Sequence, residues 1–336
     1  MKVLVVGLGS MGKRRIRNLL AIGGFDIFGF DLRKDRIEEV SKLYSISVSQ
    51  NFDELIRNHK FDSLIISVPP DLHHLYIRKS LELQLPCFVE ASVVNTDLHD
   101  LNQISLNSNI FVAPSTTLRF HPAIKLIRQF IKEGFLGETT NVLYHSGQYL
   151  PDWHTYEKVE DYYVSNPETG GAREIVPFEL TWMVEIFGFP TYVLGLNKKT
   201  IQIDGAEQID DTYNALLDYD TFIVNLTVDV VSRFATRNLV INGSKKQLKW
   251  DWNDTFVKVF DPETQLWAFY EYEVIEAQEG YNKNITEQMY IDELIQYFQS
   301  IAGKLPYSNS LDNDLKVLNV LYMIEKSSKE KIFIKL

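Results

Sequence analysis

Cysteine is almost absent from this chain of 336 residues, since Cys87 is the only one. An internal disulfide is therefore excluded, and a cytoplasmic location is the simple expectation. Long hydrophobic runs are missing as well, so we expect no membrane-spanning helix. The apolar start, residues 1–15, resembles a signal peptide only faintly, because glycines interrupt it and Lys13, Arg14 and Arg15 follow in place of a small-residue cleavage site.

Basic residues are scarce relative to acidic ones. The chain has 34 Lys and Arg against 45 Asp and Glu, a formal net charge of −11. Nucleic acids are held chiefly by clustered Lys and Arg, so we expect no nucleic-acid partner. No spacing of His, Cys, Asp or Glu resembles a zinc pattern, and we predict no metal site.

The chain has enough apolar residues to fold and is too long for one ordinary core. Hydrophobic residues make up 45% and charged residues 24%, which is typical of a globular protein. The length suggests two domains. We place them at residues 1–118 and 119–336, and the last helices may pack back on the first domain.

Short apolar runs alternate with amphipathic stretches over the first 115 residues. Such alternation predicts a doubly wound parallel sheet with crossover helices, an α/β fold of the Rossmann type. The expected strands are residues 2–7, 25–30, 63–68, 86–91 and 109–114.

A G-x-G-x-x-G motif follows the first of these strands directly. Gly7, Gly9 and Gly12 would make a tight turn, let the backbone approach a pyrophosphate and allow a helix to pack closely. The helical stretch that comes next would offer free N–H groups to that pyrophosphate. The alternative is a plain turn in an α/β domain, but the surrounding strand and helix favour a dinucleotide site.

An acidic residue, Asp31, ends the second expected strand. It is suited to accept hydrogen bonds from ribose hydroxyls and would repel a 2′-phosphate, which favours NAD over NADP. Arg33 and Lys34 follow closely and could still accommodate such a phosphate.

The chain resembles the Gfo/Idh/MocA family of oxidoreductases, the glucose-fructose oxidoreductase and inositol dehydrogenase group. The motifs that carry the resemblance are GLGSMGKRR at 7–15, SVPPDLHH at 67–74, FVEAS at 88–92, TLRFHP at 117–122, GQYLPDWH at 147–154 and TGGAREIVPFEL at 169–180. The resemblance implies a second domain with an open, mostly antiparallel sheet that carries the substrate pocket. Strand-like runs after residue 138 and two late helical stretches, 287–303 and 312–328, agree with such an α+β domain.

The N-terminal motifs define the expected cofactor site. We assign to it Gly7, Gly9, Ser10, Met11, Gly12, Asp31, Arg33, Ser67, Val68, Pro69, His73, Glu90 and Ala91. Two of these assignments have alternatives, since His73 could instead face solvent and Glu90 could merely cap its strand.

Three polar groups that the resemblance implies at the active site are missing. The family motif Glu-Lys-Pro, whose lysine is thought to act as acid or base, reads Glu90, Ala91 and Ser92 here. The family aspartate and histidine of the glycine-led helix are replaced by Ile175 and Phe178. Their joint loss suggests either changed chemistry or no chemistry.

New polar residues stand close to those losses. As catalytic candidates we take Glu174, His154, Tyr149, Arg173 and Glu179, since hydride transfer from an alcohol needs a group that takes the hydroxyl proton. The alternatives are a surface salt bridge between Arg173 and Glu174, and a hinge or oligomer contact for the aromatic-rich run 147–163.

Other side chains are candidates for holding the substrate. Trp153 could stack on a sugar or base ring and Asp152 could bind sugar hydroxyls. Arg119 and His121 could meet an anionic group, or Arg119 could brace the junction between the domains.

The leading hypothesis is an NAD-dependent oxidoreductase acting on a hydroxyl or keto group of a sugar or nucleotide-linked sugar. The alternatives are a catalytically silent NAD(H)-binding protein and non-redox sugar chemistry with a recycled cofactor. An exposed face of the second sheet favours a homodimer or homotetramer.

Overall fold

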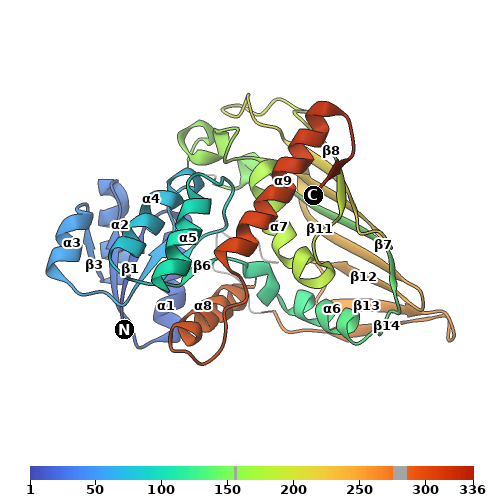
Figure 1. Cartoon of the computed structure of the whole chain (residues 1–336), viewed down its shortest axis with the longest axis horizontal. Coiled ribbons are helices and arrows are strands. Elements are labelled where there is room, and N and C mark those ends of the chain that lie inside the picture. Colours follow the sequence, from blue (N-terminus) through green and yellow to red (C-terminus); the bar gives the residue numbers. More distant parts are fainter. Residues whose placement is uncertain (155–156, 275–285) are drawn as a thin grey trace. The chain divides into compact units, whose positions relative to one another are not determined.

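The computed structural model describes residues 1–154, 157–274 and 286–336. They fall into two compact units (Figure 1). The first unit comprises Met1–Thr117 and Met289–Leu315, and the second comprises Leu118–Gln288 and Lys316–Leu336. A stretch near the end of the chain, Met289–Leu315, therefore completes the first unit.

The first unit contains a six-stranded sheet in which every pair of neighbours is parallel. Its strands are β1 Lys2–Val6, β2 Asp26–Phe30, β3 Ser47–Ser49, β4 Ser63–Ile66, β5 Cys87–Val89 and β6 Val112–Pro114. The order β3-β2-β1-β4-β5-β6 reverses between β1 and β4, and in such sheets ligands bind at the carboxyl ends of the strands at that point. The predicted Rossmann-type fold is confirmed. Strand β3, which is short and polar, was not predicted from the sequence.

Helices connect these strands. They are α1 Ser10–Ile22, α2 Lys34–Tyr44, α3 Phe52–Asn58, α4 His73–Glu82 and α5 Leu98–Ser108, with a 3₁₀ turn η1 at Pro70–Leu72 and a second, η2, at Thr117–Phe120. Side chains alternate across β2, so that Ile27 faces α1 while Phe30 contacts Phe52 of α3.

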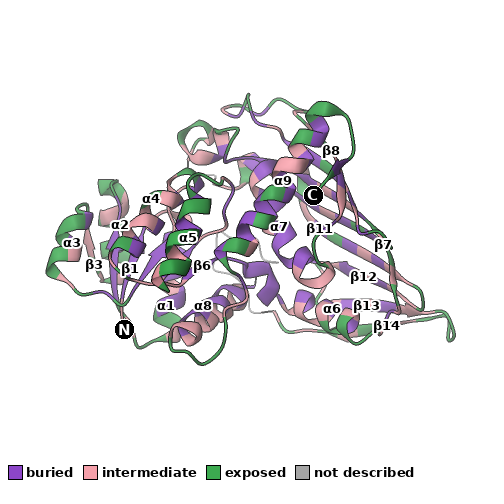
Figure 2. Ribbon diagram, viewed as in Figure 1, coloured by how far each residue is buried: buried purple, intermediate pink, exposed green. Residues whose placement is uncertain are grey.

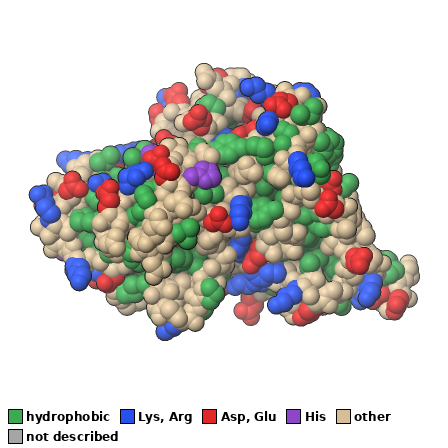
Figure 3. All heavy atoms as spheres, viewed as in Figure 1, with side chains coloured by type: hydrophobic (Ala, Val, Ile, Leu, Met, Phe, Trp, Pro, Cys, Tyr) green, Lys and Arg blue, Asp and Glu red, His purple; other side chains and the backbone are tan. Residues whose placement is uncertain are grey.

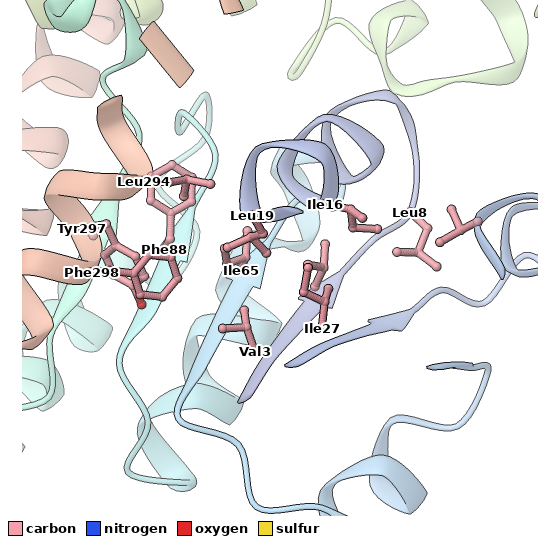
Figure 4. Close-up of a cluster of buried hydrophobic side chains, with 13 residues drawn as sticks. Val3, Leu8, Ile16, Leu19, Ile27, Ile65, Phe88, Leu294, Tyr297 and Phe298 are labelled. Atoms are coloured by element: carbon pink, nitrogen blue, oxygen red, sulfur yellow. The ribbon is translucent and has the colours of Figure 1, made fainter. Parts of the chain in front are cut away.

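The late helix α8, Glu287–Ile301, is part of the core of the first unit. Leu294 and Tyr297 are fully buried and lie beside Phe88 of β5 (Figure 4). The Tyr297 hydroxyl is 2.7 Å from Ser63 Oγ of β4. The core of this unit therefore joins both ends of the chain.

The second unit is built on a nine-stranded sheet. Its strands are β7 Thr139–Tyr149, β8 Tyr192–Lys198, β9 Thr212–Asp218, β10 Ile223–Asp229, β11 Val231–Gly243, β12 Gln247–Asp251, β13 Phe256–Asp261, β14 Leu266–Glu271 and β15 Ile334–Lys335. They run in the order β14-β13-β12-β11-β7-β10-β9-β8-β15. All neighbours are antiparallel except β7 and β10, which confirms the predicted mostly antiparallel sheet. The edge strands β14 and β15 were not predicted.

Three helices, α6 Pro122–Lys132, α7 Ala172–Phe187 and α9 Leu311–Glu330, pack on one face of this sheet (Figure 1). Most of α7 is buried (Figure 2), and its Trp182 packs edge-on against Tyr144 of β7. Gly195 of β8 lets α9 approach, because a Cβ there would lie 2.2 Å from the Ile324 carbonyl oxygen. The loop after β7 holds three 3₁₀ turns, η3 Leu150–Asp152, η4 Val159–Asp161 and η5 Tyr163–Ser165.

The described residues were searched for membrane-spanning helices and for metal-binding groups. None of their helices is both long and apolar enough to cross a membrane. Among the same residues, no group of three or more His, Cys, Asp or Glu side chains could hold a metal ion.

Candidate functional site

The glycine motif forms a turn at the carboxyl end of β1 that only glycine fits. Gly7 has a φ of +90°, and a Cβ there would lie 2.6 Å from the Ser67 carbonyl oxygen. A Cβ on Gly12 would lie 1.9 Å from the Gly7 carbonyl oxygen. The segment after β1 therefore packs directly on the segment after β4, as the predicted close turn requires.

Helix α1 starts immediately after this turn, with Gly9 as its N-cap. No side chain caps it, and its first turn, which includes Ser10 and Met11, carries no acidic residue. An uncapped helix start of this kind offers N–H groups and a partial positive charge to an anion such as a pyrophosphate.

Asp31 ties the glycine turn to the end of β2. Its carboxylate accepts hydrogen bonds from the Leu8 amide at 2.7 Å and from the Arg33 amide at 2.8 Å. The residue is 7% exposed. Asp31 thus lies where a ribose would be expected, although part of its hydrogen-bonding capacity is already used by the turn.

A basic side chain beside Asp31, that of Arg36, was not predicted from the sequence. Arg36 Nη1 lies 3.6 Å from the Asp31 carboxylate and 3.4 Å from the position of a Cβ on Gly9. Arg33, the predicted candidate, pairs instead with Asp35 at 2.7 Å. The cation positioned for a phosphate near the glycine turn is therefore Arg36.

The segment Ser67–Pro69 and the buried His73 lie at the end of β4. His73 Nε2 is 3.0 Å from the Val68 carbonyl oxygen, and burial lowers the pKa of the imidazole to about 4. The ring is neutral at pH 7, so Nε2–H donates and Nδ1 is an acceptor that is buried without a partner among the described residues. The solvent-facing alternative for His73 is wrong, since the residue is 2% exposed.

Glu90 follows β5 and is held by a buried arginine. Arg15 of α1 donates two hydrogen bonds to its carboxylate, at 2.7 and 2.8 Å, and Ser67 Oγ donates a third at 3.1 Å. Arg15 Nη2, which donates to Glu90, also lies 3.1 Å from the Glu293 carboxylate of α8. Burial alone would lower the pKa of the Arg15 guanidinium, but the charges of Glu90 and Glu293 raise it.

Glu293 is fully buried, and its carboxylate is satisfied from the end of β6. It accepts hydrogen bonds from Ser115 Oγ at 3.0 Å, the Thr116 amide at 2.5 Å and Thr117 Oγ1 at 2.8 Å. Burial raises its pKa, and Arg15 opposes this rise. Glu90, whose side chain is 14% exposed, is the carboxylate of this Arg15 cluster that reaches solvent.

The position of the missing lysine offers no ionisable group. Ala91 carries a methyl group, and the hydroxyl of the next residue, Ser92, is buried without a partner among the described residues. Cys87, inside β5, is a buried free thiol whose pKa is raised to about 12 by burial, so it does not supply a thiolate.

Two of the catalytic candidates in the second unit lie in one cluster of loop and helix residues. The Tyr163 hydroxyl donates to Glu174 Oε1 at 2.6 Å, and Tyr163 contacts Tyr162 edge-on at 6.1 Å between ring centroids. Tyr162 in turn stacks on His154 at 4.7 Å. His154 Nδ1 lies 3.9 Å from the Glu157 carboxylate. Residues 155–156 of the predicted aromatic-rich run lie outside the described residues.

The other residues predicted in this run differ in their surroundings. Trp153 is partly buried, with an indole N–H that has no partner among the described residues, while Asp152 is exposed. Tyr149, at the end of β7, is covered by the guanidinium of Arg233 at 3.9 Å from the ring centroid.

Arg173 forms its ion pair with Glu325 and not with its neighbour Glu174. Its guanidinium pairs with Glu325 of α9 at 2.6 Å and donates to the Glu168 carbonyl. The expected salt bridge between Arg173 and Glu174 is not the pair that forms. Because Arg173 is 7% exposed, it connects α7 to α9 in the interior of the second unit.

Glu179 is fully buried on the sheet face of α7. Its carboxylate accepts hydrogen bonds from the Tyr144 hydroxyl at 2.6 Å, Ser146 Oγ at 2.8 Å and Arg237 Nε at 2.8 Å. Trp182 Nε1 donates a fourth at 3.1 Å. A carboxylate with so many fixed donors is well suited to hold α7 on β7 and β11.

Arg119 and His121 are also buried in the second unit. Arg119 Nε donates to the Thr181 carbonyl at 3.0 Å. His121 caps α6 by accepting from the Ala123 amide, and its ring packs against Trp250. Burial lowers the pKa of His121 to about 3, so the imidazole carries no charge that could attract an anion at pH 7.

The structure therefore brings together the predicted cofactor residues at the carboxyl ends of β1, β2, β4 and β5. It also brings Glu174 and His154 into one cluster of the second unit. The residues that sequence reasoning missed are Arg15, Arg36, Tyr163 and Glu293. No local pattern in the sequence marks them as site residues.

Comparisons with known proteins agree with this geometry. Residues 1–104 match a family model, GFO_IDH_MocA, described as an oxidoreductase family with an NAD-binding Rossmann fold. The predicted resemblance to the Gfo/Idh/MocA oxidoreductases is confirmed over residues 1–104, which match the NAD-binding Rossmann domain of that family.

Among curated relatives, the uncharacterized oxidoreductase YrbE of Bacillus subtilis is 20% identical over 67% of this chain and 63% of its own length. The putative oxidoreductase YteT, also of Bacillus subtilis, is 27% identical over 37% of this chain and 31% of its own length. The chain thus spans less than two thirds of either relative.

Solved structures share the fold of the whole chain. An oxidoreductase from Agrobacterium radiobacter in complex with NAD+, L-tartaric acid and magnesium has a TM-score of 0.85 at 13% identity, covering 100% of this chain and 98% of that one. Levoglucosan dehydrogenase in complex with NADH and levoglucosan has a TM-score of 0.87 at 13% identity, with coverages of 100% and 99%. The WlbA dehydrogenase from Bordetella pertussis, in complex with NADH and UDP-GlcNAcA, has a TM-score of 0.82 at 13% identity, with coverages of 100% and 97%.

The residues of the first unit fit a bound NAD. The glycine turn leaves no room for a side chain at Gly7 or Gly12, the start of α1 is uncapped, and His73 Nδ1 is a buried acceptor without a partner among the described residues. A dinucleotide supplies the groups that these features lack, a pyrophosphate for the helix start and N–H or O–H donors for the imidazole.

Proposed function

We propose that this protein is an NAD-dependent oxidoreductase that acts on a hydroxyl or keto group of a sugar or a nucleotide-linked sugar in the cytoplasm. The observation that carries the proposal is the glycine turn, which combines a closed backbone, an uncapped helix start and Asp31 at the end of the next strand. This is the arrangement by which a Rossmann unit holds a dinucleotide.

NAD is the preferred cofactor in this proposal. The Asp31 carboxylate lies at the end of β2, where it can accept hydrogen bonds from ribose hydroxyls and repels a 2′-phosphate. Arg36, 3.6 Å from that carboxylate, is partly neutralised by it. The balance between these two side chains is what favours NAD over NADP.

The sugar class is supported by the similar structures and by the chemistry of the second unit. Levoglucosan dehydrogenase and WlbA are two similar proteins whose complexes contain a sugar or a nucleotide sugar. In this chain, the partly buried aromatic residues Trp153 and Tyr163 lie in the loop before α7, and Tyr163 contacts Glu174. Aromatic rings next to a carboxylate are suited to bind a ring with several hydroxyls.

A silent NAD(H)-binding protein is the second candidate. It is favoured by the three substitutions Ala91, Ile175 and Phe178, which remove the ionisable groups that the family resemblance implies. A lysine placed at position 91 separates the two candidates. Activity that appears only in the Ala91→Lys variant would identify the natural protein as silent.

The assembly is proposed to be a homodimer or homotetramer. One face of the second sheet is not covered by α6, α7 or α9, and it exposes large apolar side chains, among them Leu143 and Ile223, each 45% exposed, and Phe269, 58% exposed. Exposed apolar area of this kind marks a surface that binds another protein. A second copy of the chain is the simplest occupant.

The function is tested by incubating the purified protein with NAD+ and a panel of sugars, uronic acids and nucleotide sugars. Formation of NADH with at least one member, and much slower formation with NADP+, is the expected result. No change in the nicotinamide absorbance, together with unchanged sugars by NMR, would remove the oxidoreductase proposal.

A further inference from the structure

Tyr163 and Glu174 form a close pair at the start of α7. The distance between the Tyr163 hydroxyl and Glu174 Oε1 is 2.6 Å, which is short for a hydrogen bond and typical of one to a charged group. Tyr163 begins the 3₁₀ turn η5, whereas Glu174 lies in the first turn of α7.

The loop that carries Tyr163 is fixed against the helix start. Thr169 Oγ1 donates to the Tyr163 carbonyl at 2.9 Å, and the Gly170 amide donates to the Asn166 carbonyl at 2.8 Å. A Cβ on Gly170 would lie 2.0 Å from the Val164 carbonyl oxygen, so the two segments are in direct backbone contact. The pair is therefore preorganised by its surroundings.

The second carboxylate oxygen of Glu174, Oε2, is buried and has no partner among the described residues. The neighbouring Arg173 does not neutralise it, because that guanidinium binds Glu325 and the Glu168 carbonyl. The ring of Tyr162 contacts Tyr163 on one side and stacks on His154 on the other, and His154 Nδ1 lies 3.9 Å from the Glu157 carboxylate. Tyr163 is a titratable group that contacts the carboxylate.

These surroundings change the acidity of Glu174. Burial raises its pKa to about 7, and the hydrogen bond from Tyr163 opposes that rise. A general acid or base is most effective when it titrates near the working pH. Glu174 meets this condition, whereas Ala91, at the position of the family lysine, has no ionisable group.

We propose that Glu174 is the acid and base of the reaction and that Tyr163 is the residue that positions it, so that this pair replaces the missing lysine. The inference rests on the proposed oxidoreductase function and names the group that carries out its proton transfer. In this pair the Tyr163 hydroxyl holds Oε1, and Oε2, which is buried without a partner among the described residues, is the oxygen that we assign to the substrate.

The reaction balances with this assignment. Oxidation of a secondary alcohol breaks its C–H and O–H bonds, and a bound NAD+ would supply the acceptor for the hydride with its electron pair. Glu174 Oε2 takes the hydroxyl proton while the C=O bond forms, and it then releases that proton to water. In the reverse direction, protonated Glu174 supplies the proton to the carbonyl oxygen.

The kinetic test compares pH profiles of kcat for the wild type and three variants on the best sugar of the panel. Glu174→Gln should lower kcat about 100-fold or more, the usual effect of losing a general base, with the Kd for NADH unchanged. Tyr163→Phe should shift the limb of the kcat profile that reports the titration of Glu174 to higher pH, because the hydrogen bond that lowers the pKa of Glu174 is lost. Tyr162→Phe is the matched control, since its hydroxyl does not contact Glu174, and it should leave the limb in place.

A second measurement, on protein without cofactor or substrate, tests the Tyr163–Glu174 pair without requiring catalytic activity. NMR on protein labelled at the Glu side-chain carbons follows the titration of each carboxyl group. The signal of Glu174 is the one that is missing from the spectrum of Glu174→Gln. We expect this signal to titrate near pH 7. Titration of Glu174 near the ordinary pKa of a glutamate, or the same midpoint in wild type and Tyr163→Phe, would contradict the proposed role of the pair.

The outcomes separate the two proposals. Wild-type turnover that Glu174→Gln does not reduce would overturn the acid–base assignment and leave the oxidoreductase function standing. Absence of wild-type turnover, with Glu174 titrating near pH 7, would overturn the proposed function and the catalytic role together, and it would leave a preorganised pair in a binding pocket.

Discussion

At the scale of single residues, a fully buried arginine determines how Glu90 is presented at the cofactor site. Arg15 forms ion pairs with Glu90 and Glu293, and its guanidinium also lies over the ring of Phe88 at 4.5 Å. A buried charge is tolerated only when its partners satisfy it. The Arg15 cluster therefore fixes the Glu90 carboxylate while leaving it partly exposed.

We predict that Arg15→Met destabilises the protein by about 3–5 kcal/mol, because two carboxylates lose their shared cation in the interior. Urea unfolding measures the loss. Lys13→Met, on the same helix, is the matched control, since the Lys13 pair with Glu39 lies at the surface and such pairs contribute about 0–1 kcal/mol. Equal losses for the two variants would contradict the account of the Arg15 cluster.

Cofactor preference is a second residue-scale property. We predict that Asp31→Asn lowers the KM for NADP+ relative to that for NAD+ by about tenfold, equivalent to about 1.4 kcal/mol. The reason is that the repulsive carboxylate disappears and Arg36 becomes free to pair with a 2′-phosphate. The gain should vanish in the double variant Asp31→Asn with Arg36→Gln. A gain that persists there would mean that Arg36 is not the phosphate partner.

The sequence predicted Gly7, Gly12, Asp31 and Glu90 because each stands at the end of an apolar run or within a spaced motif. It did not predict Arg15, Arg36, Glu293 or Tyr163 as site residues. Arg15 meets Glu293 from the opposite end of the chain, and no local pattern encodes such a pairing. Tyr163 was one aromatic residue among several in its loop, and only the structure selects it.

At the scale of elements, helix α8 completes the core of the first unit, although it is far in sequence from the rest of that unit, Met1–Thr117. Phe298 packs on Phe25 at 4.4 Å between ring centroids, Tyr297 reaches Ser63, and Leu294 is fully buried. The same helix carries Glu293 of the Arg15 cluster. Packing of α8 and presentation of Glu90 are therefore coupled.

We predict that Leu294→Ala destabilises the protein by about 2–5 kcal/mol, as truncation of a buried leucine does, and that added NADH restores part of the loss by binding the folded form. Thermal unfolding with and without NADH tests this. Gln299→Ala, on the partly exposed side of the same helix, should change stability by less than about 0.5 kcal/mol. If the Leu294→Ala loss were as small as this, α8 would not be part of the core.

The predicted elements differ from the observed ones mainly at the sheet edges. Amphipathic periodicity predicted the late helices, and alternation predicted β7 to β13. Strands β3, β14 and β15 were missed because they are short or lie at an edge with one exposed side, where the hydrophobic pattern is weak.

At the scale of the whole molecule, the chain separates two tasks. The first unit provides a dinucleotide site at the carboxyl ends of a parallel sheet, and the second provides the Tyr163–Glu174 pair and a sheet with an open apolar face. On the face shown in Figure 3, Lys and Arg side chains are interspersed with Asp and Glu. A mixed surface with a net charge of −11 agrees with a small-molecule substrate better than with a polyanion.

The central claim is that this protein is built around NAD(H). Native mass spectrometry of the freshly purified protein, followed by identification of the molecules released on denaturation, tests it most directly. We predict a homodimer or homotetramer that retains NAD(H), or that takes it up in preference to NADP(H) when both are offered. Protein that neither carries a nucleotide nor retains added NADH would contradict the account.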